Sequence, residues 1–421
     1  MPKLLRNNTQ APLKPYWTTN DGRYVRLYQG NVTDVLNQLP ERSIHCVVTS
    51  PPYWGLRDYG TDKALEIGSE KTPDEFVAKM VSVFQSIRRI LRDDGTVWLN
   101  LGDTYNANQG LGFPGTGQRK AVASGYLKDT NQGKTNLKSG NLVGIPWRVA
   151  LALQADGWIL RQDIIWHKPS PMPESVRNRC TKAHEYIFLL TKSMKYYYDA
   201  DAIKTKTSQV SLNRCKQPYH YAQEELRKQS KANTVIGNRQ LVESSNKRSV
   251  WTITSQGYDG AHFATFPEKL VEPCILAGTS EYGCCSKCGA PYRRITERTK
   301  QRKHATIKRG IGATSMLQST TDTCANSVAG VESKTLGWQA TCDCNASVVP
   351  CTVLDPFIGS GTTAAVAAQL GRRSVGIDLS QDYLQNNAVP RIEGRLMSIP
   401  KLSSLVAKPI RAIKLGRKVS T

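Results

Sequence analysis

The residues of this chain most suited to chemistry form the short segment Ser50-Pro51-Pro52-Tyr53, which follows an apolar run at 46–48. Two consecutive prolines supply no N–H groups and hold φ at about −65°. The backbone carbonyls of Ser50 and Pro51 and the Ser50 hydroxyl are therefore left as hydrogen-bond acceptors. Tyr53 offers a flat ring beside them. This arrangement fits an amino group on an aromatic ring that stacks on the tyrosine.

A second segment with chemistry lies near the other end of the chain, where a strand, a glycine turn and a helix are expected. Glycines let the backbone pass close to a ligand, and the first turn of a helix presents unpaired N–H groups. The next predicted strand, 373–378, ends in Asp378, an acid where nucleotide-binding βαβ units hold ribose hydroxyls. The other ligand-binding candidates are Asp355, Pro356, Phe357, Gly359, Ser360, Gly361, Thr362 and Thr363.

Together the two segments resemble the signatures of the β-group DNA amino-methyltransferases. The segment 50–53 is similar to their (Asp/Asn/Ser)-Pro-Pro-(Tyr/Phe) acceptor motif, and 355–363 with Asp378 is similar to their cofactor-binding motifs. The acceptor motif comes first and the cofactor motif last, which is the order of this permuted group. The resemblance covers most of residues 24–395.

Two shorter segments extend the resemblance. Phe266 and Pro267 belong to a stretch that resembles the family motif beside the methionine end of the cofactor, where we expect Thr265 to cap a helix and Glu268 to complete a capping box. Asn31 stands at a strand end where the family usually has an acid. Its amide oxygen can still accept from the adenine amino group of the cofactor, but without charge.

The resemblance implies a fold, a cofactor and a reaction. The expected fold class is α/β, a class I S-adenosylmethionine-dependent methyltransferase with a Rossmann-like, mostly parallel seven-stranded sheet, circularly permuted. The implied reaction moves a methyl group from S-adenosylmethionine to the exocyclic amine of a base flipped out of double-stranded DNA. The catalytic candidates are then Ser50, Pro51, Pro52 and Tyr53. A serine in the first position favours N4 of cytosine over N6 of adenine.

Several alternatives stay open on the sequence alone. N6 of adenine can be methylated by the same motif, and RNA can replace DNA as the substrate. A zinc-containing DNA-binding module with an inactive methyltransferase core is a further alternative, which the intact segments 50–53 and 355–363 disfavour. Methylation of cytosine C5 would need a nucleophilic cysteine after a proline. The pairs at 273–274 and 350–351 lack that family's context.

Composition agrees with a nucleic-acid partner. The chain has 57 Lys plus Arg against 34 Asp plus Glu, a formal net charge of +23, which favours polyanions, although a general solubility effect is the alternative. No apolar run approaches the roughly 18 residues of a membrane span, and residues 1–10 lack an apolar signal core. We therefore expect a soluble, cytoplasmic protein that binds no membrane. A homodimer and a cognate restriction endonuclease are further partners that the resemblance allows.

The cysteines predict a structural metal site. The chain has 11 cysteines, and without a secretion signal they are expected to be reduced. Four of them have a spacing that suits a tetrahedral thiolate site for zinc: Cys285, Cys288, Cys342 and Cys344. Free thiols are the alternative, since the second pair is spaced more tightly than usual. Redox catalysis is disfavoured, because no thioredoxin-like context surrounds the first pair.

The predicted organisation follows from these motifs and from shifts in composition. The window 204–250 holds ten Lys or Arg against three acids and is rich in Asn, Gln and Ser, a mixture that contacts phosphates and base edges, with a solvated insertion as the alternative. The expected parts are a catalytic part with the acceptor motif (20–203), a target-recognition segment (204–260), a cofactor-side helix (261–283), a cysteine-rich zinc insertion (284–346), a cofactor-binding part (347–395) and a basic tail (396–421).

Hydrophobic periodicity predicts the elements that position the motifs. Buried strands are expected at 43–53 and 95–102, separated by an amphipathic helix at 73–91. A helix at 145–156 and strands at 158–166 and 184–191 are expected next, after a Gly-, Asn- and Lys-rich loop at 104–144. This is βαβ patterning, which favours a parallel sheet.

Overall fold

The computed structural model describes residues 13–19, 24–55, 65–106, 135–207, 244–256, 265–298 and 333–397. The chain divides into two compact units. The larger is drawn from 1–199, 248–293 and 340–410, and the smaller from 200–247, 294–339 and 411–421. None of the described helices is both long and apolar enough to cross a membrane.

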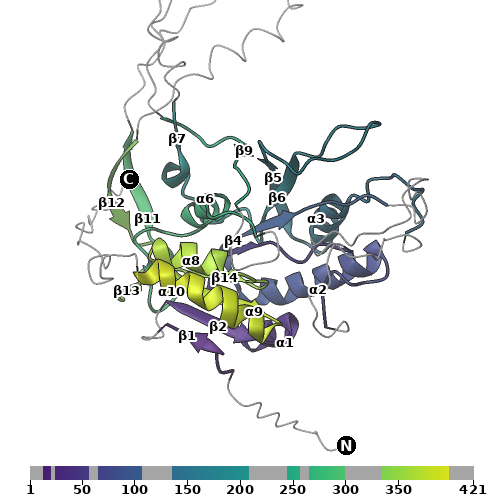
Figure 1. Cartoon of the computed structure of the whole chain (residues 1–421). Coiled ribbons are helices and arrows are strands. Elements are labelled where there is room, and N and C mark those ends of the chain that lie inside the picture. Colours follow the sequence, from purple (N-terminus) through teal and green to yellow (C-terminus); the bar gives the residue numbers. More distant parts are fainter. Residues whose placement is uncertain are drawn as a thin grey trace, which may run out of the picture. The chain divides into compact units, whose positions relative to one another are not determined.

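A mixed sheet forms the centre of the larger unit (Figure 1). Among the described residues it has nine strands, in the order β1-β2-β15-β14-β3-β4-β6-β5-β9. Their bounds in that order are Trp17–Thr18, Val25–Gln29, Arg373–Asp378, Thr352–Asp355, Ile44–Thr49, Leu91–Leu101, His184–Thr191, Ile159–His167 and Val250–Thr252.

The strands that carry the motifs are parallel. Strands β2, β15, β14, β3 and β4 run in one direction, while β6 is antiparallel to both β4 and β5. The prediction of a mostly parallel sheet is confirmed. The number of strands differs from the predicted seven, because β1 and β9, of two and three residues, pair with the edges of the seven central strands.

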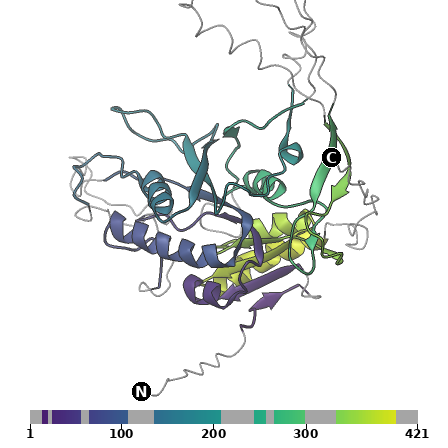
Figure 2. The same ribbon diagram turned by 180° about the vertical axis from the view of Figure 1, so that it is seen from behind.

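Helices cover both faces of the sheet (Figures 1 and 2). Helices α1, α2 and α3 pack on one face in a core that also includes Val47, Leu99 and Ile377, and α8 and α10 pack on the other face around Leu27. Helix α6 packs beside α8 and against β3. The bounds are Val32–Gln38 for α1, Pro73–Ile90 for α2, Ile145–Ala155 for α3, Glu268–Gly278 for α6, Thr362–Gln369 for α8, Gln381–Tyr383 for α9 and Val389–Met397 for α10.

Helix α2 shows how local sequence sets an element. Thr72 accepts from the Glu75 N–H, and the Glu75 carboxylate accepts from the Thr72 N–H, so the capping box is complete. Pro73 occupies the first turn, where a missing N–H costs nothing. Phe76, Met80 and the other apolar residues at helical spacing are fully buried. The helix ends one residue before the predicted boundary.

Three small sheets complete the described structure. In the larger unit β10 (Cys284–Cys285) pairs with β13 (Val348–Val349). In the smaller unit β7 (Thr205–Lys206) pairs with β8 (Ser244–Ser245), and β11 (Arg293–Arg298) with β12 (Ser333–Gln339). The 3-10 turn Asp201–Ile203 and the π-turn Leu384–Ala388 are the remaining helical pieces described. Most of the predicted recognition segment (208–243), most of the predicted loop (107–134) and residues 398–421 of the basic tail lie outside the described residues.

Candidate active site

The two predicted chemical segments meet at one edge of the sheet. Ser50 follows β3, Pro356 follows β14, Asp378 ends β15, and Asn31 lies two residues beyond β2. These four strands are parallel neighbours, so their carboxyl ends lie at the same edge. Segments more than 300 residues apart in the chain are thereby brought together.

A cavity of about 180 Å³ opens at this edge. Ser380 and Tyr383 add to its wall, and so does Glu66, a carboxylate only 8% exposed. None of these three was predicted from the sequence. Ten of the predicted site residues line the cavity, namely Asn31, Ser50, Pro52, Phe266, Pro356, Phe357, Gly359, Ser360, Thr362 and Asp378.

Asp355 lies behind the cavity and is not part of its lining. Its Oδ1 accepts from the Thr49 hydroxyl at 2.7 Å and from the Phe357 N–H at 3.1 Å, and its Oδ2 accepts from the Thr363 hydroxyl at 2.7 Å. Complete burial raises the pKa of Asp355 to about 6. The carboxylate therefore ties β3, the glycine turn and α8 together.

Gly361 also lies outside the cavity lining. Its φ of 79° is in the left-handed region, and a Cβ there would stand 3.0 Å from the Cα of Ala388. Packing against the helix backbone thus requires this glycine. Gly359, with φ of 48°, lines the cavity itself. Four more of the predicted catalytic and cofactor-binding residues do not line the cavity, namely Pro51, Tyr53, Pro267 and Thr363.

Asp378 is held with its carboxylate at the cavity wall. Its Oδ2 accepts from the Gly359 N–H at 3.0 Å and its Oδ1 from the Ser380 N–H at 2.9 Å. Burial raises the pKa of this carboxyl to about 6, against the effect of these N–H donors. At neutral pH the carboxyl is therefore mainly ionised and can accept further hydrogen bonds.

Asn31 has a role that the sequence did not suggest. Its Oδ1 accepts from the N–H groups of Thr33 and Asp34, at 2.9 and 3.4 Å, and so caps α1. Asparagine is among the best N-cap residues, which accounts for its presence at this strand end. The side chain also borders the cavity.

The predicted capping of α6 is wrong. The helix begins at Glu268 after Pro267, and no side chain caps it. Thr265 and Phe266 instead form part of the cavity wall. Glu268 forms ion pairs with Arg391 and with Arg395, which attach α6 to α10.

The acceptor segment is held by buried anchors. Trp54 is 1% exposed and its indole N–H donates to the Glu70 carbonyl at 3.0 Å. The Tyr53 ring lies against Gly102, where a Cβ would come within 2.5 Å of Tyr53 Cε2. A side chain at position 102 would therefore displace the ring.

The Tyr53 hydroxyl lies in a polar network that the sequence did not indicate. It contacts the Glu185 carboxylate at 2.7 Å, Asn100 Oδ1 at 3.2 Å and the Ser50 hydroxyl at 3.4 Å. Glu185 in turn forms an ion pair with Lys168. Glu185 and Lys168 come from β6 and from the end of β5, and Asn100 from β4, so pairing between strands assembles the network.

The four cysteines of the predicted metal site come together in the larger unit. Their Sγ atoms all lie within 4.8 Å of one another. The residue after each pair, Gly289 and Asn345, has a left-handed φ of 71° and 48°, which turns the backbone around the sulfurs. Thiolates bound to zinc at about 2.3 Å stand about 3.8 Å apart, so the arrangement fits a tetrahedral ion. The cysteines in question are Cys285, Cys288, Cys342 and Cys344.

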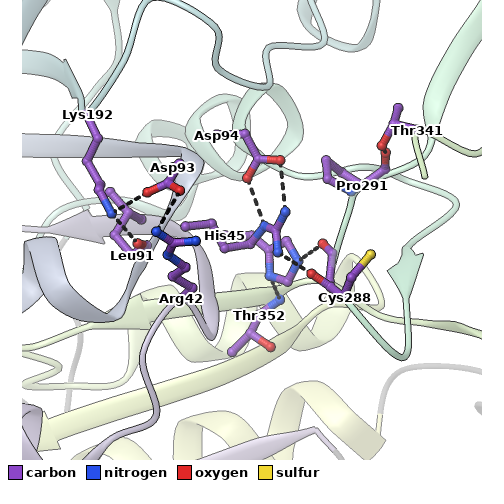
Figure 3. A network of polar contacts seen from close by, with 12 residues as sticks. Arg42, His45, Leu91, Asp93, Asp94, Lys192, Cys288, Pro291, Thr341 and Thr352 are labelled. Atoms are coloured by element: carbon purple, nitrogen blue, oxygen red, sulfur yellow. Dashed lines mark hydrogen bonds and ion pairs between the residues drawn. The ribbon is translucent and has the colours of Figure 1, made fainter. Parts of the chain in front are cut away.

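This cysteine knuckle is attached to the amino ends of the central strands (Figure 3). Arg92 donates to the Cys288 carbonyl at 2.6 Å and pairs with Asp94. His45 Nε2 lies 2.9 Å from the Gly289 carbonyl, and His45 Nδ1 accepts from the Thr352 N–H at 3.1 Å. Because an N–H can only donate, His45 is protonated at Nε2. Both His45 ring nitrogens therefore have hydrogen-bond partners, so His45 offers no nitrogen to a metal in the neighbouring group of His45, Cys284 and Cys351.

The sheet order and the cavity at its carboxyl edge define a Rossmann-like α/β fold of the kind found in methyltransferases. The solved structure described as PvuII DNA methyltransferase (cytosine-N4-specific) is similar, with a TM-score of 0.50 and 17% identity over 94% of this chain and 95% of that one.

The chain belongs to the N6/N4 DNA methylase family, whose model matches residues 44–285 and 351–389. The match leaves out most of the cysteine-rich segment. Relatives include the type II methyltransferases M.Cfr9I of Citrobacter freundii, 34% identical over 90% of this chain and 91% of that protein, and M.SmaI of Serratia marcescens, 34% identical over 86% and 88%. M.SfiI of Streptomyces fimbriatus is 32% identical over 88% and 92%.

Proposed function

We propose that the chain is a site-specific DNA methyltransferase that uses S-adenosylmethionine and methylates an exocyclic amine, with N4 of cytosine preferred and N6 of adenine as the alternative. One observation carries the proposal. Ser50 and Pro52 of the acceptor segment line the same cavity as Gly359 and Asp378 of the nucleotide-type segment. A methyl donor and an amine acceptor can therefore meet there.

The residues present fit the cofactor. Asp378 offers a partly buried acceptor for ribose hydroxyls, and Phe357 and Ile358 offer apolar walls. Helix α8 has no side-chain cap, so its first N–H groups, beside Thr362, suit the methionine carboxylate. When bound, S-adenosylmethionine supplies a methyl group on a sulfonium, which has a good leaving group.

The acceptor segment fits an aromatic amine, whose lone pair is delocalised into the ring. The Ser50 hydroxyl and the Pro51 carbonyl would accept the two amine hydrogens and favour a pyramidal nitrogen with an available lone pair. Tyr53 would stack on the flipped base in place of its lost neighbours. No covalent intermediate with the protein is required.

The topology supports a permuted catalytic domain. Strand β3, with the acceptor segment, and strands β14 and β15, with the glycine turn, come from opposite ends of the chain and lie side by side. The relatives' description as type II methyltransferases supports double-stranded DNA as substrate and a cognate restriction endonuclease as partner. We assign target recognition to 204–260.

We also propose that the cysteine knuckle binds one structural zinc ion. The four sulfurs would hold it, and the knuckle contacts Arg92 and His45 at the end of the sheet opposite the cavity. The ion would therefore act on stability rather than on the reacting atoms. Elemental analysis of freshly purified protein should find about one zinc per chain, and finding none would contradict this assignment.

The test of function is direct. Purified protein is incubated with labelled S-adenosylmethionine and unmethylated DNA, and the digested DNA is analysed by mass spectrometry. We expect N4-methylcytosine, and N6-methyladenine would select the alternative. Tyr53→Ala should keep cofactor affinity and lose most transfer, since stacking is worth about 1–3 kcal/mol and a shift of about 1 Å costs roughly a hundredfold in rate. No methylated base in the DNA would overturn the proposal.

A further inference from the structure

We propose that the Ser50 hydroxyl, the Tyr53 hydroxyl and the Glu185 carboxylate form a proton relay that carries away the proton lost by the target amine. The inference rests on the proposed function and adds a destination for that proton. A neutral methylated amine forms only if one N–H bond breaks, so a base must be within reach. Neither proline of the acceptor segment can provide one.

The relay is continuous in space. Ser50, at the cavity wall, has its Oγ 3.4 Å from Tyr53 Oη, and Tyr53 Oη lies 2.7 Å from Glu185 Oε2. The first contact is long, but catalytic hydrogen bonds commonly tighten when the substrate binds. Glu185 is thus two hydrogen bonds away from the Ser50 hydroxyl and three away from the position of the amine.

The hydrogen-bond directions run the same way along the chain of groups. An ionised Glu185 can only accept, so Tyr53 donates its single hydroxyl proton to it, at the shorter of the Tyr53 Oη contacts. Asn100 Nδ2 donates both of its hydrogens, to Glu185 Oε2 at 3.2 Å and to the Tyr186 carbonyl at 3.1 Å. Tyr53 Oη then accepts from the Ser50 hydroxyl at 3.4 Å. Each hydroxyl is therefore oriented to pass a proton toward Glu185.

The step balances. The amine nitrogen forms a bond to the methyl carbon as the bond from that carbon to sulfur breaks, and the sulfur keeps that electron pair. The nitrogen loses a proton to Ser50 Oγ and keeps the electron pair of the N–H bond. Ser50 passes its own proton to Tyr53, and Tyr53 passes its proton to Glu185. The positive charge of the sulfonium and the negative charge of Glu185 disappear together.

Lys168 and solvent complete the relay. Lys168 pairs with the other oxygen of Glu185 and lies 4.3 Å from the centre of the Trp166 ring. Its ammonium group therefore stands beside the carboxylate that receives the proton. The side chains of Glu185 and Lys168 are 13% and 21% exposed, so the proton can pass to water after each turnover.

The experiment compares single-turnover methyl transfer to DNA by the full chain and by the variants Tyr53→Phe, Glu185→Gln and their double variant. Tyr53→Phe keeps the stacking ring and removes only the hydroxyl. We expect each single variant to slow transfer by about a hundredfold, as is typical of lost general-base catalysis, with unchanged cofactor affinity. The double variant should be no slower than the slower single variant, because both interrupt one path. Glu174→Gln, which removes a carboxylate paired with Arg179, is the matched control and should retain wild-type rates.

The pH profile separates a relay from a purely positioning role. The wild-type rate should fall toward acid pH, and this acid limb should be absent in Glu185→Gln. Variants within threefold of wild type, an unchanged acid limb, or losses that multiply in the double variant would each overturn the relay while methylation by wild type stands. Absence of methylation by wild type in the same assay would overturn the proposed function and the relay with it.

Discussion

The Thr49 hydroxyl donates to Asp355 Oδ1 at 2.7 Å across 306 positions of sequence, between the last residue of β3 and the last residue of β14. Both residues are 1% exposed. This bond fixes the start of the acceptor segment relative to the glycine turn. The contact thereby holds the acceptor segment and the glycine turn in register, and neither of its two residues lines the cavity.

Replacing Asp355 by alanine should therefore destabilise the protein. The Thr49 and Thr363 hydroxyls would lose bonds to a charged group, each worth about 1.5–3 kcal/mol. We expect the free energy of unfolding to fall by roughly 2–4 kcal/mol, measured by urea denaturation. Asp355→Asn keeps one acceptor oxygen and should lose less. Equal stability of wild type and the alanine variant would contradict the linking role.

Wild type and Asp355→Asn should also differ in how their stability depends on pH. The folded pKa of Asp355, about 6, lies above the ordinary value of 3.8. Its contribution to stability is thus fully present below about pH 4 and is lost as pH rises through about 6. The stability of wild type relative to Asp355→Asn should fall between pH 4 and pH 7. A difference that is constant or grows over this range would contradict the raised pKa.

Much of the scaffold could be predicted, because its signals are local. The capping box at Thr72 and Glu75 with Pro73 defines the start of α2, and short apolar runs define β6 and β15 to the residue. The acid that ends β15 was found for the same reason. Each of these features is set by residues within one turn of helix or one strand.

The polar partners of Tyr53 could not be predicted, because they depend on register between strands. Asn100 pairs with Ile187 across β4 and β6, and Glu185 pairs with Trp166 across β5 and β6. A shift of one residue would turn these side chains to the other face. The alternation of the sequence does not determine that register. The predicted cap of α6 failed because two nearby residues, Thr265 and Pro267, both suit a helix start, and the helix begins after Pro267.

Cofactor binding should depend on Asp378 and on pH. S-adenosylmethionine should bind without DNA, and Asp378→Ala should weaken it by about 1–3 kcal/mol through a lost ribose contact. Because only the ionised carboxylate accepts fully, affinity should fall as pH drops below about 6. Asp378→Asn should show a flatter profile. Calorimetry that gives wild-type affinity for the alanine variant would remove Asp378 from the site.

The metal should be lost when one thiolate is removed. Cys288→Ser should lower zinc content well below one per chain and reduce the free energy of unfolding by roughly 3 kcal/mol, as loss of a structural metal does. Cys180→Ser is the control, because Cys180 is exposed and lies outside both cysteine clusters. If both variants keep the same metal content and stability, the four cysteines are ordinary thiols.

Position 102 gives a test of the Tyr53 ring that leaves the ring itself unchanged. In Gly102→Ala the new Cβ would stand 2.5 Å from Tyr53 Cε2, far closer than real contacts, so the ring must move. Gly102 does not line the cavity, and cofactor affinity should stay within twofold of wild type. Methyl transfer should fall by about a hundredfold, the cost of a displacement near 1 Å. Gly394→Ala, whose Cβ meets nothing within 4 Å in helix α10, is the matched control and should transfer methyl groups at the wild-type rate. Wild-type transfer by both variants would show that the position of Tyr53 does not limit the reaction.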